Sequence, residues 1–257
     1  MGLEFTLSGF IVGLLVGLTG VGGGSLMTPL LVLLFKINPA IAIGTDLLYA
    51  SITKSAGAIS HSKLGHIQWN VVQKLMLGSI PASILTTFFL KQMNLDSPNT
   101  MNIIEMCLGI ALIFTAIAVL TQPIIIERSK NKVIKNNPNT GHLTILLGLF
   151  LGIMVTVTSV GAGALGVTAL LILYPKMSVK NIIGTDIAHA VPITFIAGLG
   201  HYNLGHVDFI LLGTLLLGSI PGIWVGSFLS SKIDENKLRY FLVIILILIG
   251  IKLIINF

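Results

Sequence analysis

The chain has 257 residues, of which 54% are hydrophobic and only 9% are charged, and its net charge is +6. Apolar segments of membrane-spanning length follow one another along the chain, which predicts a polytopic α-helical membrane protein and excludes a water-soluble domain. The short alternating stretches of a transmembrane barrel are missing. Basic loops explain the positive charge, so we expect no nucleic-acid partner.

The first apolar segment, residues 8–35, is interrupted by a glycine-rich stretch from Gly17 to Ser25. Unbroken, it would form a helix of roughly 42 Å, which exceeds the roughly 30 Å core of a bilayer. Glycines at this density weaken a helix and permit positive φ angles. We therefore expect two half-helices that meet inside the membrane. A glycine-rich packing face between helices is the alternative.

Spans are predicted next at 40–60, 69–90 and 101–120, which complete a first repeat over residues 1–121. Residues 122–142 are polar and basic, so we expect a solvated cytoplasmic linker there. A second repeat over 143–257 has the same plan. Its parts are a broken segment at 143–174 and spans at 181–200, 207–230 and 238–255.

Four short motifs of the first half recur in the second half, three of them 140 residues later and one 139 residues later. The pairs are Val21-Gly22 with Val160-Gly161, Ile43-Gly44-Thr45-Asp46 with Ile183-Gly184-Thr185-Asp186, Leu64-Gly65-His66 with Leu204-Gly205-His206, and Gly78-Ser79-Ile80-Pro81 with Gly218-Ser219-Ile220-Pro221. Their shared order and spacing indicate an internal duplication.

Positive charges test the topology, because cytoplasmic loops carry an excess of lysine and arginine. If both broken segments crossed the membrane, the basic residues outside the spans would divide seven against seven between the two faces. If each broken segment is a re-entrant hairpin, they divide three against eleven. The second arrangement makes the halves inverted repeats with both termini outside the cell. A span that is split without turning back is the alternative.

Asp46 and Asp186 each end an Ile-Gly-Thr-Asp motif, preceded by Thr45 or Thr185, just inside the span that follows a broken segment. A carboxylate inside a membrane is costly and indicates function. It can couple transport to a proton or cation, or it can contact the substrate. The alternative is that each Thr-Asp pair caps the first turn of its helix. An Asp next to a broken segment can also support that segment.

Lys54 is the one basic residue expected inside a span, and Thr194 takes its place in the second repeat. Lys54 can pair with a carboxylate or a substrate anion, or it can extend to the nearby membrane face. His189 lies three residues after Asp186 on the same helical face, which suggests a proton relay. A histidine bonded to a neighbouring hydroxyl is the alternative.

No motif of a catalytic or cofactor site is present, so we expect no enzyme and no cofactor. The histidine pairs His61/His66 and His201/His206 do not place both rings on one helical face, and we expect no metal site. The single cysteine, Cys107, excludes an internal disulfide.

The order and repetition of the motifs resemble the sulfite exporter TauE/SafE family along essentially the whole chain. The resemblance implies a secondary transporter of the cytoplasmic (inner) membrane for sulfite, organosulfonates or related small sulfur-containing anions, coupled to an ion gradient. The substrate-binding residues that it implies are those of the two glycine-rich breaks: Gly22, Gly23, Gly24, Ser25, Gly161, Gly163 and Ala164. The second copy departs from the pattern with alanine at Ala162 and Ala164, so it would bind through its backbone.

Residues and resemblance together suggest an anion held near the midplane by the N–H groups of the half-helices. Hydroxyls of Thr19, Ser25, Thr158 and Ser159 would add hydrogen bonds, and Lys54 would add charge. Relative movement of the two repeats would then alternate access. A gated anion channel, a sulfur-handling membrane protein and a structural scaffold are the competing interpretations. The oligomeric state, the coupling ion and the direction are left open by the sequence.

Overall fold

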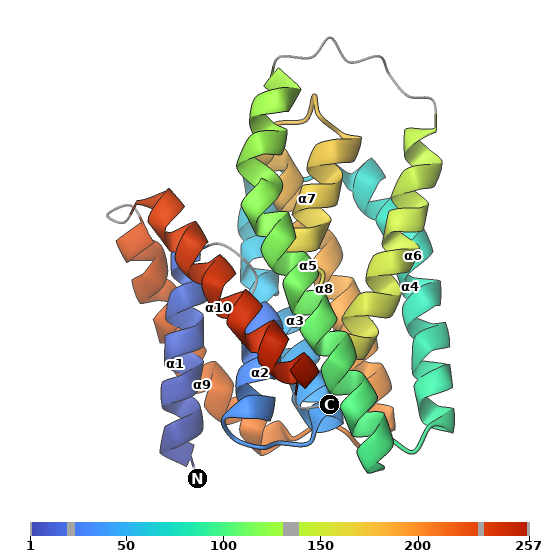
Figure 1. Cartoon of the computed structure of the whole chain (residues 1–257). Coiled ribbons are helices and arrows are strands. Elements are labelled where there is room, and N and C mark those ends of the chain that lie inside the picture. The colour runs from blue at the N-terminus through green and yellow to red at the C-terminus, as the bar shows by residue number, and fades with distance from the viewer. Residues whose placement is uncertain (1, 20–23, 131–138, 231–233, 256–257) are drawn as a thin grey trace.

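The computed structural model describes residues 2–19, 24–130, 139–230 and 234–255, and the regular structure in these ranges is α-helical (Figure 1). The helices of the first half are α1 (Gly2–Thr19), α2 (Gly24–Leu33), α3 (Pro39–Lys63), α4 (Trp69–Gln92) and α5 (Pro98–Lys130). Those of the second half are α6 (Thr140–Thr158), α7 (Ala164–Leu173), α8 (Val179–Asn203), α9 (Phe209–Ser230) and α10 (Glu235–Ile255).

Six of the described helices, α4, α5, α6, α8, α9 and α10, are long and apolar enough to cross a membrane. Large apolar side chains such as Trp224 and Phe228, 83% and 71% exposed, lie on their outer sides. A bilayer accommodates such a surface. The prediction of a polytopic α-helical membrane protein is confirmed. Helix α3, predicted as a span at 40–60, is 25 residues long but is not one of the six, since serines, threonines and Lys54 make it more polar.

Helix α5 continues to residue 130, so residues 122–130, predicted as the start of a solvated linker, are helical. Ile125 and Ile126 pack against apolar side chains of α7, and burial of these isoleucines favours the longer helix. The linker prediction is wrong for this stretch. At the other end of the predicted linker, residues 140–142 form the first turn of α6 and are helical as well. Residues 131–138 lie outside the described residues.

The two broken segments open toward opposite ends of the molecule. In Figure 1 the outer ends of α1 and α2 both lie at the bottom of the view, whereas those of α6 and α7 lie at the top. Helices α1 and α2 therefore run in opposite directions, and so do α6 and α7. In each half, two helices of unequal length meet well inside the helical bundle.

The same helix packing occurs twice with the halves exchanged. Helix α1 packs along α9, and their counterparts α6 and α4 pack along each other. Gly13 of α1 lies against the backbone of Ser219, and Gly152 of α6 lies against the backbone of Ser79. A Cβ atom at either glycine would overlap the facing backbone. Glycine at these positions lets the helix backbones touch.

Helices α3 and α8 pack side by side, and each supports a helix of the other half. The Thr45 hydroxyl accepts the N–H of Asp208, directly before α9, at 3.0 Å. The Thr185 hydroxyl accepts the N–H of Gln68, directly before α4, also at 3.0 Å. Both threonines thus satisfy a backbone group at a helix start that has no intrahelical partner.

The close contact of α1 with α9 predicts that Gly13→Ala destabilises the protein relative to Gly213→Ala. Both changes gain about 1 kcal/mol of helix propensity. The methyl at Gly13 meets the Ser219 backbone, and overpacking costs about 1–3 kcal/mol, whereas nothing lies within 4 Å of a Cβ atom at Gly213. Thermal unfolding in detergent should place Gly13→Ala several degrees below Gly213→Ala. Equal melting temperatures would contradict the packing.

Candidate functional site

The second break, between α6 and α7, has a backbone that depends on glycine. Ser159 ends α6 with a left-handed φ of 59°, and Gly161 and Gly163 have φ angles of 130° and 133°. Residues with a Cβ atom rarely adopt the last two angles. The Gly161 carbonyl accepts the N–H of Gly166 at 3.1 Å, so part of the interrupted backbone bonds locally. The break is a defined turn inside the bundle.

The first break lies between α1, which ends at Thr19, and α2, which begins at Gly24. The predicted site residues Gly22 and Gly23 lie outside the described residues, and so does the side chain of Thr19. Ser25, in the first turn of α2, is buried.

Asp46 ties the two broken segments together. It is fully buried seven residues after the start of α3, where Asn38 is the N-cap, so the capping interpretation is wrong. Asp46 Oδ2 accepts hydrogen bonds from the hydroxyls of Thr28 at 2.5 Å and Ser159 at 2.9 Å. Thr28 belongs to α2 and Ser159 to the break of the other half. One carboxylate oxygen thereby joins both halves.

Asp186 lies at the N-terminus of α7, the position that the sequence analysis proposes for the substrate. Ser178 caps α8, so Asp186 is not a cap either, and it is only 1% exposed. The backbone N–H of Gly163, directly before α7, donates to its carboxylate. Gly166 leaves the space for this group, since a Cβ atom there would overlap Asp186 Oδ1. That oxygen has no hydrogen-bond partner among the described residues.

Lys54 lies in the wall of a cavity of about 490 Å³ that both halves form. Asp186, Gly163 and Gln122 contribute to the same wall, which is otherwise mainly apolar. The Lys54 Nζ atom donates to the carbonyl of Ala162, inside the second break, at 2.7 Å. Lys54 also interacts electrostatically with Asp186 and, more weakly, with Asp46. The cavity wall therefore brings Lys54, one carboxylate and the start of a half-helix together, and Arg239 is a second cation in the same wall.

Two polar groups near this cavity are absent from the sequence predictions. Gln122 of α5 lines the cavity, and its Nε2 atom donates to the Thr168 hydroxyl at 3.0 Å. Thr168 in turn donates to the Ala164 carbonyl at 2.7 Å. The sequence feature that indicates the role of Gln122 is the apolar run at 124–126. This run extends the helix past Gln122, so that Gln122 is a polar residue inside the membrane.

The cavity reaches the surface on the face where α5 ends and where α8 and α10 begin. The starts of α8 and α10 contribute Val179, Leu238 and Arg239 to its lining, and Val179 is 36% exposed. The end of α5 on this face carries Arg128 and leads into the basic segment between the halves. The cavity therefore opens toward the basic face of the protein.

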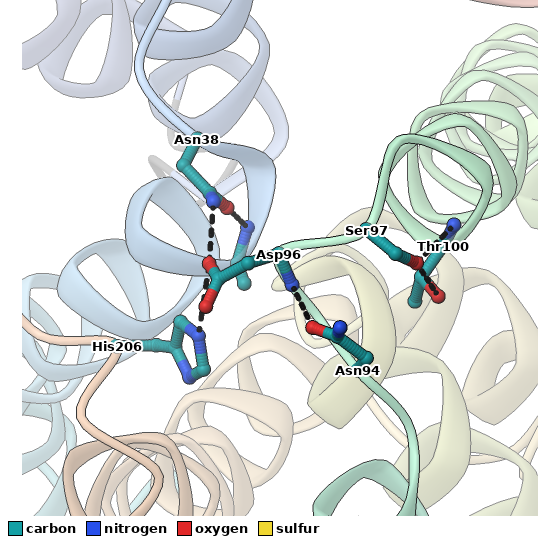
Figure 2. Close-up of polar contacts among 7 residues, drawn as sticks. Asn38, Asn94, Asp96, Ser97, Thr100 and His206 are labelled. Carbon is teal, nitrogen blue, oxygen red and sulfur yellow. Dashed lines mark hydrogen bonds and ion pairs between the residues drawn. The ribbon is translucent and has the colours of Figure 1, made fainter.

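On the opposite face, Asp96 joins three loops (Figure 2). Its Oδ1 atom accepts a hydrogen bond from Asn38 Nδ2 at 3.0 Å and lies 3.7 Å from Nε2 of His206. Asn38 precedes α3, Asp96 lies between α4 and α5, and His206 lies between α8 and α9. Side chains of both halves therefore meet at this face.

Two of the predicted polar side chains have partners away from the cavity. His189 is buried, and its Nε2 atom bonds to the Ser79 hydroxyl at 2.9 Å. This matches the hydroxyl-bonded alternative to a relay with Asp186. The Thr158 hydroxyl donates to the Met154 carbonyl of its own helix at 2.6 Å. Neither His189 nor Thr158 lines the cavity.

The predicted residues thus separate into a cavity group and a bracing group. The cavity group consists of Lys54, Gly163, Ala164 and Asp186. The bracing group consists of Thr45, Asp46, Thr158, Ser159, Thr185 and His189. Over the described ranges, no three histidine, cysteine, aspartate or glutamate side chains gather as a metal site would require.

A sequence model of the sulfite exporter TauE/SafE family matches residues 5–253. The chain belongs to the TauE/SafE family. The resemblance seen in the sequence is confirmed, and the protein is a membrane transporter and not an enzyme. The second half of the duplication, with its more divergent glycine-rich break, lies within the match.

Three relatives of this TauE/SafE protein are described as probable membrane transporter proteins. YjnA of Bacillus subtilis is 40% identical over 99% of this chain and 100% of the relative. YdhB of the same organism is 26% identical over 90% of this chain and 91% of the relative. A protein of Methanocaldococcus jannaschii is 28% identical over 95% of this chain and 91% of the relative. No solved structure gives a significant match.

The bonds of Asp46 predict that Thr28→Val destabilises this TauE/SafE protein. Valine keeps the shape of threonine but removes the hydrogen bond to a buried carboxylate, a bond type worth about 1.5–3 kcal/mol. Thr86→Val is the matched control, because Thr86 bonds only to the Ala82 carbonyl of its own helix. Thermal unfolding in detergent should show a clearly larger loss for Thr28→Val. A loss no greater than that of Thr86→Val would mean that Asp46 does not brace α2.

Proposed function

We propose that this protein is a secondary transporter that moves small sulfur-containing anions, such as sulfite or organosulfonates, across the cytoplasmic membrane by alternating access, driven by an ion gradient. The observation that carries the proposal is the position of Lys54. Its ammonium group lies in a cavity beside the N-terminus of α7. A cation and the positive end of a helix both favour an anion there.

The size and lining of the cavity support a small solute. A volume of about 490 Å³ lies in the usual range for small-molecule sites. The apolar walls of the cavity include Val16, Val119 and Leu242. A small inorganic anion would not cover these side chains. Lys54 can hold a sulfonate or sulfite group while these walls contact an organic body, which favours organosulfonates as substrates.

The two halves act in this proposal as inverted repeats with re-entrant hairpins. The exchanged packing of α1 with α9 and of α6 with α4 supports a two-fold relation between the halves. The opposite directions of the two hairpins support an inverted relation (Figure 1). Inverted repeats are a common plan of transporters whose halves move against each other around one site.

We propose that this arrangement is one of the two states that alternating access requires. The cavity reaches the basic face, which the positive-inside rule places in the cytoplasm. The opposite face is joined by Asn38, Asp96 and His206. In the other state, the contacts around Asp96 open and the mouth between Val179 and Leu238 closes.

Transport should depend on the charge of Lys54. We expect wild-type protein in liposomes to take up labelled sulfite or methanesulfonate with saturation, and Lys54→Gln to weaken the apparent affinity at least about tenfold, or 1.4 kcal/mol. Lys63→Gln, which removes an exposed lysine at the end of the same helix, is the control and should resemble wild type. If neither wild type nor Lys54→Gln takes up these anions above the level of empty liposomes, transport of these anions is refuted. A conductance that does not saturate would instead indicate a channel.

The proposed topology places both termini on the outer face. In a Cys107→Ser background, single cysteines at Gly2 and Ile255 should react with an impermeant thiol reagent added to intact cells. A cysteine at the exposed Ser62, in the last turn of α3, should react only after the cells are opened. If Ser62→Cys is labelled from outside while the terminal cysteines are protected, the orientation of the protein is the reverse of the one proposed. Labelling of the two termini from different sides would exclude inverted repeats.

A further inference from the structure

The position suited to the substrate anion already holds a carboxylate of the protein itself. Asp186 accepts the Gly163 N–H at the start of α7 and lines the same cavity as Lys54. It is 1% exposed, and its Oδ1 atom has no hydrogen-bond partner in the part of the chain that the structure describes. Gly166 provides the space that the carboxylate occupies. Asp186 therefore has the contacts that an anionic substrate group would make.

Charge in the cavity limits what can bind there. Lys54 is the charged side chain that acts on Asp186, and with Asp186 ionised this pair carries no net charge. An anion that arrives beside the pair would bring a negative charge that the pair does not compensate, into a site enclosed mainly by apolar side chains. Such a charge is strongly disfavoured in a low-dielectric environment. A proton on the Asp186 carboxylate removes the excess charge and leaves Lys54 to the substrate.

We propose that Asp186 is an internal substitute for the substrate anion: it neutralises Lys54 in the empty transporter and takes up one proton when an anion replaces it. The inference rests on the proposed function and identifies the proton as the ion that is coupled to transport. The proton enters from the water on the side to which the cavity opens and becomes the carboxyl hydrogen of Asp186. Anion and proton then cross together, so the net charge moved is zero.

The groups that face Asp186 are compatible with this role. Helix α3 presents Lys54, and α7 has no titratable side chain along its length. On α8 itself, His189 is bonded to Ser79 of α4. Helix α6 meets α8 through its Thr156 carbonyl, which bonds to His201. Arg239 of α10 adds a second positive charge to the same cavity wall, whereas the charge that acts on Asp186 is that of Lys54.

Asp46 provides a control at the equivalent position of the first half. It is equally buried, but two hydroxyls bond to its Oδ2 atom, and it does not line the cavity. The role of Asp46 is therefore structural, and removal of its charge should leave the number of protons taken up per anion unchanged.

Methanesulfonate is the probe for the test, because a sulfonate stays ionised throughout the accessible pH range whereas sulfite itself titrates. Purified wild-type protein in weakly buffered detergent should take up one proton for each methanesulfonate bound, and the apparent affinity should rise up to about tenfold for each unit by which pH falls. Asp186→Asn should bind without proton uptake and without this pH dependence. Asp46→Asn should keep one proton per anion.

Liposomes extend the test to transport. A pH gradient of one unit should drive wild type to accumulate methanesulfonate up to about tenfold on the alkaline side. Asp186→Asn should exchange labelled for unlabelled anion across the membrane but should not respond to the gradient. Gradient-driven accumulation by Asp186→Asn, or loss of its anion binding in folded protein, would overturn the inference.

Two further outcomes separate the inference from the proposed function. Saturable wild-type transport without proton uptake would overturn the inference and leave the transporter intact, and this measurement needs no variant. If Asp186→Asn does not fold, infrared difference spectra of wild type decide the point: binding must increase the absorption of a protonated carboxyl group, and a spectrum without this increase would overturn the inference. Absence of any wild-type transport of sulfonates or sulfite would instead remove the proposed function.

Discussion

A broken helix inside a membrane exposes polar backbone that has no water to bond, and the structure is arranged around that constraint. Two buried carboxylates, Asp186 of α8 and Asp46 of α3, bond to the broken segments. Asp186 accepts the Gly163 N–H at the break between α6 and α7. Asp46 accepts the Ser159 hydroxyl at the same break and the Thr28 hydroxyl of α2 in the other broken segment. A carboxylate accepts several hydrogen bonds at once, so it can stabilise donors that a neutral side chain would leave unmatched.

Close helix packing makes these short contacts possible. The breaks use glycine for its backbone angles, as at Gly161 and Gly163. The helices around them use glycine for close approach, as at Gly13 against Ser219 and Gly152 against Ser79. In a lipid environment no hydrophobic force between helices compensates for poor packing, so contact of backbones must supply the attraction. Glycine therefore serves two purposes in this chain, and the repeated motifs contain the second kind too, since a Cβ atom at Gly78 or Gly218 would overlap the facing backbone.

The sequence alone predicts the helical membrane class, the duplication and the candidate residues of the cavity, because motif order and hydropathy are local properties of the chain. It does not predict the partners of those residues. Asp46 bonds to Ser159, 113 residues away, and Lys54 to Ala162, 108 residues away. Such pairs follow from how the halves pack. The end of α5 reads as a linker in the sequence because its polar neighbours outweigh three isoleucines in composition. In the structure, α7 supplies the apolar surface that keeps this end helical.

The two halves share a fold but not the chemistry of their equivalent positions. Lys54 corresponds to Thr194, whose hydroxyl bonds to the Ala190 carbonyl of its own helix. Among the described residues, each of the two carboxylates has an Oδ1 atom without a hydrogen-bond partner. Asp46 accepts two hydroxyl hydrogen bonds at its Oδ2 atom and does not line the cavity, whereas Asp186 does. A symmetric site with two lysines would balance two anions. The pair of Lys54 and Asp186 balances one negative charge at a time, so in the proposed cycle Lys54 holds a single anion, and Asp186 takes its place when the anion leaves.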